Sequence, residues 1–134
     1  MRDIEHARMM LTLARKDLKA ARGMTDVEEF DVEIFGFHAQ QSVEKTLKAW
    51  LSLAGVEYPR THNLTQLFSL LEECGASIPE QFYALVDLTD FADQFRYEAF
   101  EGSDSEVDRL EAIDRVAELV EYVETLIKEA EAAG

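Results

Sequence analysis

The stretch from Phe37 to Gly55, FHAQQSVEKTLKAWLSLAG, constrains the fold most strongly, because apolar residues recur in and just before it with the period of an α-helix. On a helical wheel they occupy an arc of about 160°, which is too wide for a helix on a protein surface. They are Phe35, Gly36, Ala39, Val43, Leu47, Trp50, Leu51 and Ala54. We therefore expect a central helix over Phe37–Ala54 that contacts at least two others.

A narrow stripe of polar residues lies opposite this arc, and we predict that it is the exposed face of the central helix. It comprises His38, Gln41, Lys45, Lys48 and Ser52. The stripe has two interpretations. Its lysines hold a nucleotide phosphate or an acidic partner, or Glu44 and Lys48, spaced i, i+4, form a surface ion pair without further function.

One amide, that of Gln40, falls on the apolar side of the central helix. Without hydrogen-bond partners a buried amide costs about 1–3 kcal/mol, so some other group must bind it. We expect another helix to supply that group.

The rest of the chain also has helical periods, and no segment alternates as a strand does. Expected helices run from Asp3 to Arg22 before Gly23, from the capping pair Asn63 and Gln66 to Gly75, from Pro79 to Arg96, and onward from Ser105. Cys74 is predicted to be a small core residue, and Val107 and Leu110 are predicted to lie in the seam of the last helix. The pattern predicts one all-α domain over residues 1–134, an up-and-down bundle of four long helices plus a shorter one. Because the first and central helices both have broad apolar faces, we also predict a homodimer.

Charge is distributed unevenly along the chain, whose net charge is −15. Residues 1–23 contain six basic and three acidic side chains, whereas the remainder contains seven basic and 25 acidic ones. The basic residues of the first helix form either a solvated face or a phosphate-binding one. The acidic remainder repels a polyanion, so we expect no binding of nucleic acid without a partner and favour a basic protein as that partner.

Motifs for metals, cofactors and membranes are not found in the sequence. A single cysteine leaves no disulfide and no cysteine cluster, and the three histidines lack the spacing of metal ligands on a helix. No apolar run approaches about 18 residues, and no secretory signal precedes the first helix. We therefore expect a cytoplasmic protein without a metal or cofactor.

Three features, in this order, resemble the HEPN domain of prokaryotes. They are the pattern HxxQxxEKxLKAxL from His38 to Leu51, the pair Thr61–His62 before a leucine-rich helix, and the pair Arg96–Tyr97. The resemblance covers nearly the whole chain. It implies a helical bundle that commonly dimerises and that acts beside a small nucleotidyltransferase in a toxin–antitoxin pair, or else cleaves RNA without a metal.

In ribonuclease members of the family, an arginine is followed after four to six residues by the histidine that serves the cleavage. Counted from Arg96, the three corresponding positions hold Glu101, Gly102 and Ser103, and no histidine follows His62. Cleavage through the 2′-hydroxyl needs a base such as an imidazole.

Three residues of the resemblance keep two interpretations each. Arg96 either binds phosphate or pairs with a neighbouring acid such as Asp93 or Glu98. His62 either binds a ligand or stabilises the loop before its helix. Tyr97 is either an aromatic residue at the edge of the core or part of a ligand surface.

We therefore predict a non-catalytic HEPN binding module with no catalytic or metal-binding residue. It binds a nucleotide or is the partner subunit of a separately encoded minimal nucleotidyltransferase. The predicted ligand-binding residues are His38, Gln41, Lys45, Lys48, His62, Arg96 and Tyr97. The alternatives are a metal-independent HEPN ribonuclease toxin, whose base comes from elsewhere, and a helical dimeric scaffold without a ligand.

Overall fold

The computed structural model describes residues 2–91 and 105–134, and in these residues the regular secondary structure is entirely helical. The elements are α1 (Ile4–Arg22), α2 (Val32–Leu53), α3 (Leu64–Glu73), the 3-10 helix η1 (Glu80–Phe91) and α4 (Glu106–Ala133). None of these helices is both long enough and apolar enough to cross a membrane. The all-helical bundle predicted from the sequence is confirmed.

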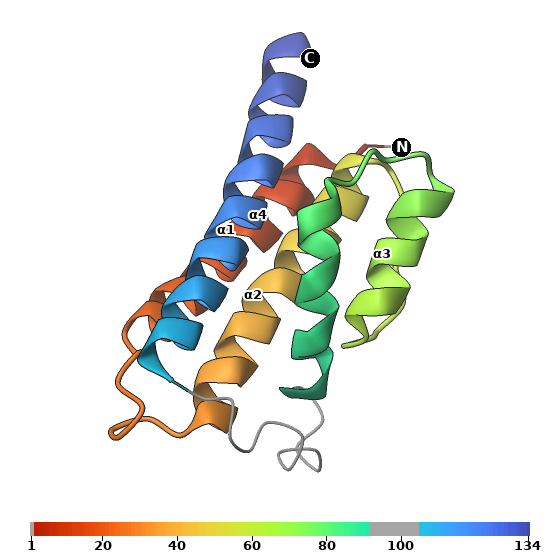
Figure 1. The fold of residues 1–134 in the computed structure, drawn as a ribbon. Coiled ribbons are helices and arrows are strands. Elements are labelled where there is room, and N and C mark those ends of the chain that lie inside the picture. Colours follow the sequence, from red (N-terminus) through yellow and green to blue (C-terminus); the bar gives the residue numbers. More distant parts are fainter. Residues whose placement is uncertain (1, 92–104) are drawn as a thin grey trace.

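The second helix, α2, lies at the centre of the bundle and contacts α1, α3, η1 and α4 (Figure 1). This confirms that the central helix contacts at least two others. Of its 22 residues, 14 are buried, which explains why its apolar arc is so wide. Ala54 is the exception in the arc, because it caps the C-terminus of α2 and is exposed.

Side chains predicted to cap helices are found in that role. The side chain of Asn63 accepts a hydrogen bond from the backbone N–H of Gln66 at the start of α3. That of Ser105 accepts one from Asp108 at the start of α4. Each bond satisfies a backbone donor that has no partner inside its helix.

The connector of residues 54–63 runs back along α2 instead of turning directly into α3 (Figure 1). It leaves α2 through Gly55, whose φ of 79° lies in the left-handed region that favours glycine. Near its end, the carbonyl of His62 accepts a hydrogen bond from Gln40, far back on α2. As a result α3 points in the same direction as α2, and the connector brings its polar side chains to the flank of α2.

The fourth helix differs from the regular helix that the sequence pattern predicted. It is a 3-10 helix, in which side chains three residues apart line up. Phe82 and Leu85 are accordingly buried, and the half-buried Leu88 follows three residues later. The predicted continuation to Arg96 lies outside the described residues.

Three residues predicted to be buried are exposed. Cys74 is exposed because it caps α3 beyond its last turn. Val107 is 64% exposed and Leu110 is 47% exposed. The buried seam of α4 instead begins at Arg109 and continues through Ile113 and Val116, which turns the two aliphatic residues toward the surface.

Two arginines predicted to lie on a solvated or phosphate-binding face of α1 instead connect α1 to α4. Arg8 pairs with Glu124 and, at 2.9 Å, with Glu131. Arg15 pairs with Glu124 at 3.0 Å and with Glu121 at 2.8 Å. Ion pairs between α1 and α4 therefore use part of the positive charge of α1.

Candidate functional site

A buried carboxylate, that of Glu44, is the centre of the polar contacts on α2, and only 4% of this residue is exposed. Its Oε1 accepts hydrogen bonds from Gln40 Nε2 at 3.0 Å and from His62 Nδ1 at 2.8 Å. Its Oε2 accepts one from Lys48 Nζ at 2.9 Å. Burial by itself raises the pKa of Glu44, but these hydrogen bonds, that from Lys48 first, bring it below its usual value. The carboxylate is therefore ionised at neutral pH.

The imidazole of His62 is held by this carboxylate although 67% of its side chain is exposed. Because an ionised carboxylate only accepts hydrogen bonds, Nδ1 of His62 carries the hydrogen, and Nε2 remains for contacts with other molecules. The backbone of His62 is fixed as well, since its carbonyl accepts from Gln40 Nε2 at 3.1 Å. Contacts with Glu44 and Gln40 thus fix the exposed ring of His62 in one orientation.

The amide of Gln40 has partners, but they do not come from another helix, so that prediction is wrong. Its Nε2 donates to Glu44 on α2 itself and to His62 on the connector. Its oxygen accepts from Gln41 Nε2 at 2.8 Å. The connector takes the place of the expected helix because it runs back along α2.

The other end of the polar stripe is bound to α1. Asp17 of α1 accepts a hydrogen bond from Lys45 Nζ at 2.6 Å, and its other oxygen lies 3.1 Å from His38 Nδ1. The two predicted lysines therefore belong to two separate clusters, one around Asp17 and one around Glu44.

The prediction that the stripe is exposed is wrong, because α1 and the connector cover it. The exposed fractions of the side chains are 29% for His38, 26% for Lys45 and 12% for Lys48. The Glu44–Lys48 pair forms as the spacing predicted, but it is buried and not on the surface. Arg96 and Tyr97 lie outside the described residues. Ligand binding by the seven predicted residues remains a prediction.

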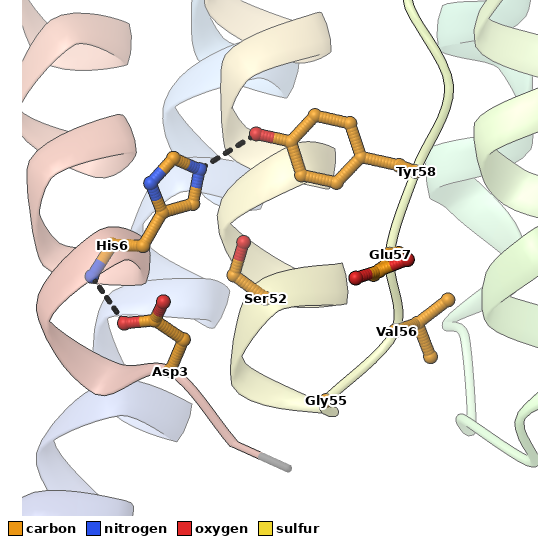
Figure 2. Close-up of a pocket in the computed structure, with 7 residues that line it drawn as sticks. All are labelled: Asp3, His6, Ser52, Gly55, Val56, Glu57 and Tyr58. Atoms are coloured by element: carbon orange, nitrogen blue, oxygen red, sulfur yellow. Dashed lines mark hydrogen bonds between the residues drawn. The ribbon is translucent and has the colours of Figure 1, made fainter.

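A pocket of about 440 Å³ opens where the start of α1, the end of α2 and the connector meet (Figure 2). It is lined by Asp3, His6, Ser52, Gly55, Val56, Glu57 and Tyr58. Tyr58 joins this pocket to the Glu44 cluster, because Lys48 Nζ lies 5.4 Å from the centroid of its ring. The hydroxyl of Tyr58 lies 2.7 Å from His6 Nε2.

Sequence reasoning missed this pocket, since its residues come from three elements and share no helical stripe. The available signal was the polar and aromatic content of the segment VEYPRTHN, which lies between the two helices expected at Phe37–Ala54 and from Asn63 onward. In residues 2–91 and 105–134, no three His, Cys, Asp or Glu side chains are grouped so as to hold a metal ion.

Comparison with known proteins places these features in a family context. The model of the HEPN domain family matches residues 7–128. The fold is similar to the crystal structure of an archaeal HEPN homologue, with a TM-score of 0.62 and 24% sequence identity over 95% of this chain and 99% of that chain. No curated protein sequence matches the chain.

Proposed function

Because the chain belongs to the HEPN domain family, we propose that it is a non-catalytic binding module and the partner subunit of a separately encoded minimal nucleotidyltransferase. The two proteins form a toxin–antitoxin-like pair, in which this chain is a homodimer that binds a basic surface of the enzyme.

The observation that supports this proposal most directly is that several basic side chains are bound by acceptors of the same chain. Arg8, Arg15, Lys45 and Lys48 form ion pairs with carboxylates of the same chain. Arg109 is 1% exposed and donates to backbone carbonyls. These five basic groups are bound by acceptors of the chain itself, and the net charge of the chain is −15. A surface of this kind attracts a cationic protein and repels a polyanion.

Nucleotide binding by the polar stripe is a less favoured form of the same proposal. For the stripe to hold a phosphate, Lys45 has to leave Asp17 and Lys48 has to leave Glu44. Breaking such a partly buried pair costs free energy that the nucleotide must offset. We therefore place partner binding first.

We expect the purified chain to form a complex with the nucleotidyltransferase encoded beside it. The association rate constant should fall about tenfold or more between low and physiological ionic strength. The reason is that the screening length shrinks from about 30 Å at 0.01 M to about 8 Å at 0.15 M salt. Stopped-flow mixing over a salt series measures this rate. The proposal fails if no complex forms at micromolar concentrations, or if the rate does not respond to salt.

We also expect the purified chain not to cleave RNA, because no histidine follows Arg96 to act as the base. Incubating labelled RNA with the protein in the presence of a chelator tests this. Metal-independent cleavage that disappears in Arg96→Ala would contradict the prediction.

One observation favours the ribonuclease alternative. The imidazole of His62, oriented by the ionised Glu44, has the arrangement of a general base. If RNA cleavage is found, and is lost in a folded His62→Gln variant, then His62 acts as the general base in place of a histidine after Arg96. The protein is in that case an enzyme.

A further inference from the structure

The pocket in Figure 2 is held in shape by hydrogen bonds between all three elements that line it. The backbone N–H of Asp3 donates to the carbonyl of Ser52 at 3.0 Å, which joins α1 to the end of α2. The N–H of Gly55 donates to the same carbonyl at 3.1 Å. Across the opening, His6 of α1 contacts the hydroxyl of Tyr58 in the connector. The pocket is therefore formed before any ligand arrives, which lowers the cost of binding.

Two carboxylates face this space from opposite walls. Asp3 belongs to α1 and uses one oxygen to accept the backbone N–H of His6, so that its second oxygen remains. Glu57 belongs to the connector and lines the pocket on the side opposite Asp3 (Figure 2). Neither acid forms an ion pair with another described residue, and no lysine or arginine lines the pocket.

The floor of the pocket adds a third acceptor. Ser52 is only 6% exposed, and its side chain points into the pocket between the two carboxylates (Figure 2). The hydroxyl oxygen of Ser52 has two lone pairs, which can accept from a donor in the pocket.

A ligand that matches these walls is a cation with several donors and no acceptor. The guanidinium group meets this description, since it has five N–H donors in a planar fork and binds carboxylates in pairs of hydrogen bonds. An ammonium group is a compact point charge and reaches fewer of the acceptors at once. Two carboxylates in a pocket with no lysine or arginine in its lining disfavour a phosphate.

We propose that this pocket receives an arginine side chain of the partner protein. The inference rests on the proposed function, because that function calls for a basic protein as the partner. The pocket lies at the surface, and its volume of about 440 Å³ exceeds that of one side chain. The space therefore also admits part of the segment that carries the arginine.

A peptide titration tests the chemistry without the partner. The probe is a blocked Gly-Arg-Gly peptide, and its control carries citrulline, which keeps the shape but replaces the guanidinium by a neutral urea. We expect the arginine peptide to shift the amide NMR signals of residues 55–58 and of His6. The citrulline peptide should bind at least about tenfold more weakly, since charge-assisted hydrogen bonds are lost. Equal binding of the two peptides would overturn the inference.

The double variant Asp3→Asn/Glu57→Gln removes both charges while keeping the shapes of the side chains. Asparagine also caps helices well, so α1 should keep its start. The matched control is Asp114→Asn/Glu118→Gln, which changes the net charge equally at two exposed positions of α4. We expect the first variant, and not the control, to bind the arginine peptide and the nucleotidyltransferase at least about tenfold more weakly.

The outcomes separate the two proposals. If the partner binds both variants as tightly as the parent, the pocket is not the contact and the proposed function survives. If the parent binds the arginine peptide but no nucleotidyltransferase, the proposed function fails and the pocket chemistry stands. If spermidine binds as tightly as the arginine peptide and the partner complex is indifferent to the pocket, a free polyamine is the ligand and the arginine assignment is wrong.

Discussion

Replacing Glu44 by glutamine is expected to lower the free energy of unfolding at neutral pH by about 3–5 kcal/mol, the usual effect of breaking a buried ion pair from one side. The new amide would place two hydrogens among donors from Gln40, Lys48 and His62. Urea unfolding followed by circular dichroism measures the change. Glu118→Gln on the exposed face of α4 is the control, and it should alter stability by less than about 0.5 kcal/mol.

The pH dependence gives the Glu44 prediction a second test. The pKa of Glu44 is below its ordinary value of 4.5 in the folded chain, because the hydrogen bonds outweigh the effect of burial. Ionisation of Glu44 therefore contributes its full stabilisation above about pH 4.5, and that contribution is lost as the pH falls through the folded pKa. The stability difference between parent and Glu44→Gln should shrink on acidification. A constant difference from pH 7 to pH 3 would contradict this account.

Replacing Arg109 by methionine is expected to cost about 3–5 kcal/mol and to loosen the turn between α1 and α2. The guanidinium, which is 1% exposed, donates to the carbonyls of Met24 and Phe30 at 2.8 Å each and to that of Asp26 at 3.3 Å. It also lies 5.2 Å from the centroid of the Phe35 ring. Methionine fills part of the space but leaves the carbonyls of Met24 and Phe30 without the donor that Arg109 supplies.

Hydrogen exchange distinguishes this mechanism from a general loss of stability. In Arg109→Met, the backbone amides of residues 24–31 should lose protection before those of α3 do. Arg115→Met provides the control, since Arg115 is exposed and makes only a long hydrogen bond of 3.4 Å to the carbonyl of Gln81. Uniform loss of protection, or a cost below about 1 kcal/mol, would refute the role assigned to Arg109.

Local signals in the sequence were enough to predict the four α-helices, although not the 3-10 form of η1. The capping residues Asn63 and Ser105 act through the backbone N–H groups three residues on, so their roles depend only on nearby chain. The apolar period of α2 likewise predicts its burial, because a wide arc needs several neighbours. Features of this kind require no knowledge of which segments meet.

The polar partners were harder to predict because they depend on tertiary contacts. The side chains of Lys45 and Arg8 were expected to lie on solvated faces. Instead Lys45 pairs with Asp17 of α1, and Arg8 pairs with Glu124 of α4. Gln40 was expected to meet a helix and meets the connector. A helical wheel shows which residues share a face, but it does not show that an acid from another element will cover that face. The pocket could not be predicted for the same reason, because its lining residues come from three separate elements.

The ion pairs between α1 and α4 also bear on the order in which the chain folds. Arg8 and Glu124 are 116 positions apart, whereas α1 and α2 are joined by a short turn. Contacts between distant residues form only after a large loss of chain entropy. We therefore expect the α1–α2 hairpin to form early in folding and α4 to dock onto it late. Interactions made after the transition state mainly govern the rate of unfolding. The lifetime of the folded bundle is thus set largely by α4, and during synthesis the apolar flank of the hairpin stays uncovered until the last helix leaves the ribosome.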